Sequence, residues 1–218
     1  MHSQPRRRAL QIAFIMLFGA LGAATPALAQ GAGGRGREPQ AEQFVQDAAQ
    51  KVVAVLADRK LSLAQKDATF HEAINELADV PKVTNFVLGK YARTITPAQR
   101  QQFATAFRAY AESVYQNRIS DYRGEKLTVT GSVVRKPGDV VVNTTISGGQ
   151  LDRPVAVAWR VQGAAGSWKV VDVQFKGVWL AITQQQDFVS TIDNAGGDIG
   201  VLIAQLQRDA QRPATASR

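Results

Sequence analysis

Residues 168–188 read WKVVDVQFKGVWLAITQQQDF, and this stretch decides how the chain folds. It opens with the period-two alternation of a strand, turns at Gly177, and continues with the spacing of a helix. One face of that helix is predicted to carry Val178, Ile182, Gln185 and Phe188 or Val189. The stretch contains no nucleophile–base pair, no cluster of metal ligands and no phosphate-binding loop.

Upstream of this stretch, the same alternation marks further strands. The four strand candidates cover residues 127–135, 139–147, 153–161 and 167–175. They are joined by short turns that contain glycine, at residues 136–139, 147–150 and 163–166. Short turns between successive strands predict an antiparallel meander of four strands.

Helical periodicity flanks the predicted sheet on both sides. Before it, apolar faces recur from residue 41 to 56, over residues 64–78 and over a shorter stretch at 83–91. The clearest helix begins at Thr96, because Thr96 and Gln99 form a capping box around Pro97. After the sheet, Gly196 and Gly197 separate helices over 178–192 and 199–206. The fold class is therefore α+β, with N-terminal helices, the meander, and C-terminal helices packed on one face of the sheet.

The two ends of the chain differ in composition from its middle. Residues 1–29 combine three arginines, an apolar run and a small-x-small site ending at Ala29, which is typical of a cleaved secretory signal peptide. An uncleaved membrane anchor is the alternative interpretation of this run. Residues 30–40 are predicted to be a flexible lead-in, because their glycine-rich and charged composition is typical of a linker. A single domain follows over residues 41–210, and residues 211–218 form a loose tail.

Composition narrows the chemistry that an exported domain of this size could perform. The chain has no cysteine, so it forms no disulfide and no thiolate metal site. Without residues 1–29 it has 23 basic and 18 acidic residues, a net charge of +5. This charge suits contact with anionic headgroups or an acidic partner, as well as ordinary solubility. Nucleic acid is not a predicted partner, because the basic residues form no single stripe.

Few residues in the chain could carry catalysis. Its histidines are His2, within the predicted signal peptide, and His71, which has no partners arranged for nucleophilic catalysis. Asp187, Asp193 and Asp198 lie in the C-terminal helical region, but Asp193 and Asp198 are better explained as a helix end and a cap around Gly196 and Gly197. We therefore predict neither an enzyme nor a cofactor or metal site. The apolar faces remain, and periodicity alone does not distinguish a filled core from a ligand cavity.

Several motifs resemble one known family. They are Asp172-Val173-x-x-x-Gly177-Val178 with Phe188, then Leu88-Gly89-x-Tyr91, and Thr96-Pro97-x-Gln99-Arg100-x-x-Phe103. Together they are similar to the MlaC-type family, also called the toluene-tolerance family, of periplasmic phospholipid-binding proteins. The resemblance runs from about Phe44 to Leu206. Trp179 and Thr183-Gln184-Gln185 depart from the family pattern. With these departures the chain resembles a divergent branch of the family, the one associated with hopanoid lipids (HpnM-type proteins).

The resemblance implies a lipid carrier with an apolar cavity between sheet and helices. Its cargo would be a phospholipid or a hopanoid-like lipid. Its partners would be an inner-membrane ABC transporter complex with an MCE domain and an outer-membrane lipoprotein complex, and a soluble shuttle would be a monomer. The lipid-binding residues are expected among Val87, Tyr91, Phe103, Phe107, Tyr110, Val114, Val157, Trp159, Val173, Phe175 and Trp179. The alternatives are a periplasmic scaffold with a filled core and, less favoured, a hydrolase that uses an acidic pair.

Overall fold

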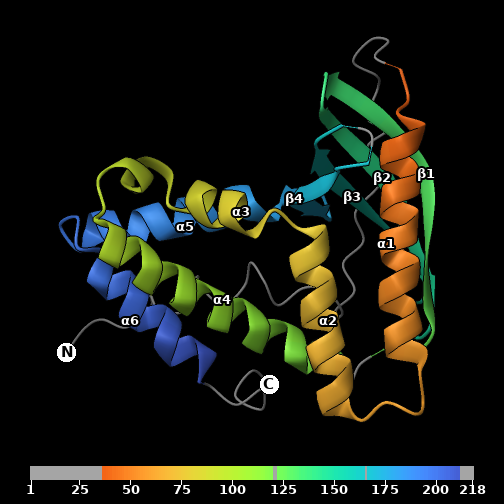
Figure 1. Cartoon of the computed structure of the whole chain (residues 1–218), viewed down its shortest axis with the longest axis horizontal. Coiled ribbons are helices and arrows are strands. Elements are labelled where there is room, and N and C mark those ends of the chain that lie inside the picture. The colour runs from red at the N-terminus through yellow and green to blue at the C-terminus, as the bar shows by residue number, and fades with distance from the viewer. Residues whose placement is uncertain (1–35, 120–121, 165, 212–218) are drawn as a thin grey trace.

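The computed structural model describes residues 36–119, 122–164 and 166–211, and within 115–119 it describes only the backbone. The predicted signal peptide, most of the lead-in and nearly all of the tail lie outside the described residues. The described chain is an α+β fold, as the sequence predicts. Figure 1 shows an antiparallel sheet with two helices beside it and a separate group of helices at one end.

The sheet is the predicted meander with one further strand. Its order follows the chain: β1 (Glu125–Lys136), β2 (Asp139–Gly148), β3 (Val155–Gln162), β4 (Lys169–Phe175) and β5 (Val178–Trp179). Strand β5 is too short to show alternation, and the sequence predicts four strands for that reason. It exists because Lys176 and Gly177, with φ of 48° and 83°, form a tight turn that folds the chain back onto β4.

The helices agree closely with the predicted ranges. They are α1 (Pro39–Ala57), α2 (Leu63–Leu77), α3 (Val80–Val87), the 3₁₀ helix η1 (Gly89–Arg93), α4 (Pro97–Ile119), α5 (Leu180–Asn194) and α6 (Ile199–Ala210). The capping box at the start of α4 is confirmed, since Thr96 and Gln99 exchange side-chain-to-backbone hydrogen bonds of 2.9 and 3.2 Å. Helix α1 begins inside the predicted lead-in, because Pro39 occupies a first-turn position where its missing N–H costs nothing. No helix in the described part of the chain has the length and apolarity to cross a bilayer.

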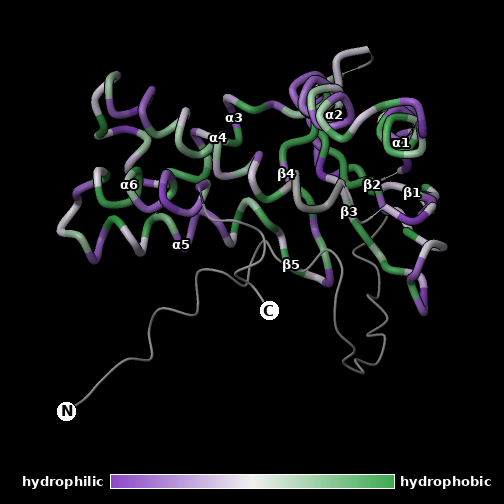
Figure 2. Tube along the Cα trace, turned by 90° about the horizontal axis from the view of Figure 1, so that it is seen from below, coloured by the Kyte–Doolittle hydropathy of each residue, from purple (hydrophilic) through white to green (hydrophobic). Residues whose placement is uncertain are grey.

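The molecule has two separate hydrophobic cores. The sheet core joins Ala41 and Val45 of α1 to Val140, Val142, Val161 and Trp168. The helical core contains residues of α3, α4, α5 and α6 and no strand residue. The helix that lies across the sheet is therefore α1, and α5 and α6 extend beyond the β4–β5 edge (Figures 1 and 2). This differs from the expected packing of the C-terminal helices on a sheet face, because the tight turn after β4 directs α5 away from the sheet.

The predicted face of α5 is wrong by about one residue. Its buried residues are Ala181, Gln184, Phe188 and Ile192. Val178 and Ile182 are instead 49% and 40% exposed. The helix starts only at Leu180, after the pairing of β5 with β4, so its phase is set by a contact that periodicity cannot reveal.

Candidate functional site

The titratable groups offer no assembled catalytic centre among the described residues. His71 lies between two carboxylates, with its Nε2 3.2 Å from Asp67 and its Nδ1 3.9 Å from Glu112. Glu112 belongs to α4, so this cluster links α2 to α4 at the junction between the two halves of the molecule. No serine, threonine or cysteine nucleophile is bonded to His71 in the described structure. No three His, Cys, Asp or Glu side chains of the described residues are arranged so that they could hold a metal ion.

The aromatic stripe of α4, which the family resemblance places among the lipid-binding residues, lies largely in the helical core. Phe103 is fully buried, and its ring stacks on Phe107 at a centroid distance of 5.7 Å. Phe188 of α5 packs edge-on against both rings, at 5.8 and 5.6 Å. Burial raises the pKa of Tyr110, at the border of this core, to about 12, so its hydroxyl stays protonated.

Two further members of the predicted set belong to the same helical half. Val87 is completely buried at the end of α3. Tyr91 packs its ring against the core, and its hydroxyl donates a hydrogen bond to Asp193 at the end of α5. Lys90 binds the same carboxylate at 2.8 Å, and together these bonds hold the pKa of Asp193 below its ordinary value. Tyr91 therefore fastens η1 to α5.

The strand residues of the predicted set fall on one face of the sheet, with one exception. Val157 lies opposite Phe175, and Trp159 lies opposite Val173, on the face that α1 covers. Val157 and Phe175 are buried, whereas Trp159 and Val173 are half-buried. Trp179 lies opposite Gln174, so the register places it on the other face of the sheet.

Several large apolar side chains of α2, α4 and the sheet are only half-buried. Helix α2 presents large apolar residues at steps of four and three, yet it has no buried residue. We call the following set the inner apolar surface: Phe70, Ile74 and Leu77 of α2, Val114 of α4, and Trp159 and Val173 of the sheet. In Figure 2, helices α1 and α2 lie on the same side of the sheet. Trp159 and Val173 are on the sheet face that α1 covers, so they are on the side where α2 lies.

Hydrogen bonds hold the elements around this surface in place. Backbone atoms of Asp79 and Val170 join the end of α2 to β4 at 3.0 Å, and the Lys169 amine donates to the carbonyl of Glu76. On the sheet, the Trp159 indole donates to the Thr144 hydroxyl at 2.9 Å, and that hydroxyl donates to the carbonyl of Val157. The polar atoms of Trp159 and Thr144 are thereby satisfied, which leaves the Trp159 ring as an apolar contact.

The opposite face of the sheet is polar and ion-paired. Arg160 forms a bidentate bond to Asp139, with distances of 2.9 and 2.7 Å. This guanidinium holds the pKa of Asp139 below its ordinary value. Asp172, on the same face, has its pKa raised by burial, although its Oδ1 accepts the N–H groups of Val173 and Ala181 at 2.8 Å each. These charged and hydrogen-bonded groups make this part of the face less suited to apolar ligand chains than the α1 side.

Of the predicted lipid-binding residues, Val114, Trp159 and Val173 are only half-buried and belong to the inner apolar surface. The other members of this surface, Phe70, Ile74 and Leu77, are not in the predicted set. Amphipathic periodicity is the same for a helix packed in a core and for one that faces a ligand, so the apolar face of α2 gives no signal of binding in the sequence.

The family model described as MlaC protein matches residues 46–208, which is most of the chain. The chain belongs to the MlaC family. The match covers α2 to α5, the whole sheet and nearly all of α6, and so it includes the helical core, the strand residues of the sheet core and the inner apolar surface.

Individual relatives agree with this assignment. The intermembrane phospholipid transport system binding protein MlaC of Haemophilus influenzae is 26% identical over 58% of this chain and 60% of its own length. The toluene tolerance protein ttg2D of Pseudomonas putida is 22% identical over 71% of this chain and 74% of its own length. The phospholipid-binding protein of Ralstonia solanacearum, solved in complex with a phospholipid, superimposes with a TM-score of 0.69. It is 26% identical, and the match covers 78% of this chain and 96% of that one.

Proposed function

We propose that this MlaC-family protein is a periplasmic lipid carrier whose inner apolar surface holds the acyl chains of a phospholipid. It acts by binding and release, without catalysis and without a cofactor. The observation that carries the proposal is the apolar face of α2, none of whose residues is fully buried. Large apolar side chains that a fold leaves partly open to solvent are suited to contact an apolar ligand.

The energetics of lipid transfer fit a surface of this type. Two acyl chains of about fifteen methylenes each, at about 0.8 kcal/mol per methylene, would cost about 24 kcal/mol if exposed to water. A bilayer and an apolar protein surface both remove this cost, so transfer between them is close to neutral. Such a balance allows the same protein to load and to unload.

The comparisons support phospholipid as the cargo and exchange between membranes as the setting. The Ralstonia solanacearum protein has a phospholipid bound, and the name of the Haemophilus influenzae relative describes an intermembrane phospholipid transport system. The route that we propose, following the family resemblance, runs between an inner-membrane ABC transporter complex with an MCE domain and an outer-membrane lipoprotein complex. A monomer suits this shuttling role, and cleavage after Ala29 would deliver the protein to the periplasm.

Native mass spectrometry tests the proposal directly. The full chain is exported to a bacterial periplasm, purified without detergent and sprayed under native conditions, and the bound material is extracted into organic solvent. We expect one phospholipid per protein. A hopanoid in its place would keep the carrier but change its cargo, and a protein that is empty and takes no lipid from vesicles would contradict the carrier and favour a scaffold.

A matched pair of variants locates the binding site. Ile74→Asp places a charge on the inner apolar surface, and we expect the folded variant to lose most of its bound lipid. Val201→Asp is the control, because Val201 is 44% exposed on α6, away from that surface. Equal lipid content in the two folded variants would place the lipid elsewhere.

A further inference from the structure

The segment from α3 through α4 carries charge of a single sign. Between Asp79 and Glu112 the sequence contains no acidic residue, and it contains Lys82, Lys90, Arg93, Arg100 and Arg108. In a chain with 26 basic and 18 acidic residues, this separation concentrates the positive charge in one helical region.

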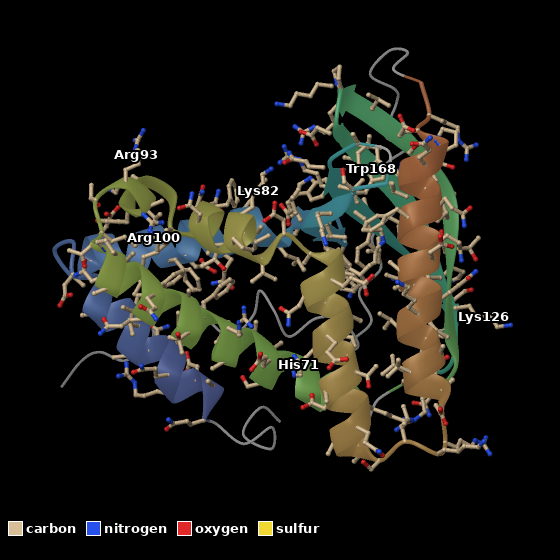
Figure 3. All side chains as sticks on the ribbon, viewed as in Figure 1. His71, Lys82, Arg93, Arg100, Lys126 and Trp168 are labelled. Carbon is tan, nitrogen blue, oxygen red and sulfur yellow. The ribbon has the colours of Figure 1, made fainter. Side chains whose placement is uncertain are left out.

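Two of these cations lie along the edge of the helical half that is uppermost in Figure 3. Lys82 on α3 and Arg93 on η1 are exposed and point away from the body there. Arg100 lies close beneath, where its guanidinium donates to Asn85 at 2.6 Å and to the carbonyl of Ala92, neither of which is charged. The acidic groups at this edge are Asp79, which caps α3, and Asp193, which binds Lys90.

Exposed apolar side chains lie among these cations. Phe86 is one helical turn after Lys82 and is 38% exposed, and Ile182 on the adjoining α5 is 40% exposed. The two helices are joined here, because the Gln185 amide donates to the carbonyl of Phe86 at 2.6 Å. We call Lys82, Phe86, Arg93 and Ile182 the α3–α5 surface.

We propose that the α3–α5 surface docks on an anionic phospholipid bilayer. Lysine and arginine would pair with headgroup phosphates, while Phe86 and Ile182 would enter the boundary between headgroups and acyl chains. The inference rests on the proposed function, because it states how a carrier meets the membrane from which its cargo comes.

The composition of the surface favours a bilayer over a protein partner. A stable protein interface requires a broad, well-packed apolar centre with a polar rim. Here only two exposed apolar side chains, Phe86 and Ile182, accompany the cations, and such a combination suits the boundary between headgroups and acyl chains. Charge attraction of this kind is screened by salt, so binding should weaken as ionic strength rises.

Vesicle flotation with the full-length mature chain tests the proposal. We compare phosphatidylcholine vesicles with vesicles in which one third of the lipid is phosphatidylglycerol, at low and at physiological salt. The test variant is Lys82→Gln with Arg93→Gln. The control is Lys126→Gln with Lys136→Gln, which removes the same charge from exposed residues of β1, outside the α3–α5 surface. Figure 3 shows Lys126 on the far side of the molecule from Arg93.

We expect the wild type to bind the anionic vesicles in preference and to release them as salt is raised. The partition coefficient should fall about fivefold for each cation removed from the α3–α5 surface, and the β1 control should change it much less. Phe86→Ser should weaken binding at both salt concentrations, because its contribution is not electrostatic. Equal losses in the two double variants, or equal binding to neutral vesicles, would overturn the proposal. Bound lipid is measured in the same samples, so a carrier that loads normally without docking is distinguished from a protein that carries no lipid.

Discussion

At the scale of single residues, Gly89 shows why one position in the family-like motif Leu88-Gly89-x-Tyr91 requires glycine. It is the first residue of η1, two positions after the end of α3, and its φ of +54° is a left-handed conformation that side chains disfavour. A Cβ there would lie 2.7 Å from Cγ2 of Val189, within the range where atoms must move apart. Gly89 therefore allows the α3–η1 junction to pack directly on α5.

Gly89→Ala should consequently destabilise the protein by about 2 kcal/mol or more, from backbone strain together with the clash. Gly177→Ala is the control, because Gly177 also has a positive φ, of +83°, but a Cβ there would meet nothing within 4 Å. Its cost should be limited to the strain of about 1 kcal/mol. Urea unfolding measures both, and equal losses would show that packing against Val189 contributes nothing.

At the scale of elements, β4, the tight turn, β5 and α5 behave as one unit anchored by Asp172. Its Oδ1 accepts the N–H of Ala181 in the first turn of α5, an N–H group that has no partner within the helix. The side chain thus ties the start of α5 to the strand that precedes it. Burial at this junction raises the pKa of the carboxyl, because the charged form loses its hydration there.

Two substitutions of Asp172 distinguish the contribution of its hydrogen bonds to stability from the contribution of its charge. Asp172→Ala should lower the free energy of unfolding by about 1–3 kcal/mol, whereas Asp172→Asn keeps an acceptor oxygen and should cost less. Because the pKa of Asp172 is raised in the folded state, its contribution to stability falls as pH rises through that pKa. The stability of the wild type relative to Asp172→Asn should therefore decrease from acidic to neutral pH. Chemical unfolding of the wild type and of Asp172→Asn across this pH range measures the difference.

At the scale of the whole molecule, the two hydrophobic cores are joined through elements that neither core buries. Helix α2 contacts α1 on one side and α4 on the other, through the Lys51–Glu76 ion pair and the His71–Glu112 contact. A lipid on the inner apolar surface would add contacts to both halves. Bound lipid should therefore raise the free energy of unfolding of the protein.

Removing the lipid should lower the thermal midpoint, because a ligand at 100 to 1,000 times its Kd stabilises the folded state by about 3–4 kcal/mol. Hydrogen exchange should rise most in α2, whose apolar face would lose its partner. Exchange in α6 should change least, because Leu202 and Leu206 are buried in the helical core. A uniform rise across both helices would contradict a site on the inner apolar surface.

Much of the fold follows from local patterns in the sequence. The strand ranges follow from period-two alternation, the turns from glycine, and the start of α4 from Thr96 and Gln99, whose capping bonds involve only neighbours along the chain. The start of α6 is also decided locally, since the side chain of Asp198 accepts the N–H of Gly200. Such features are decided within a few residues, and for that reason the sequence determined them by itself.

Only the tertiary structure decided the phase of α5 and the division of the apolar residues. Ile182 is exposed because β5 pairs with β4 before the helix begins, and Asp172 holds that start in place. Phe103 and Ile74 occur in similar periodic patterns, yet one is fully buried and the other is half-buried. The difference depends on which other elements lie against each helix. Periodicity determines which face of a helix is apolar, whereas contacts between residues distant in the sequence determine whether protein or ligand covers that face.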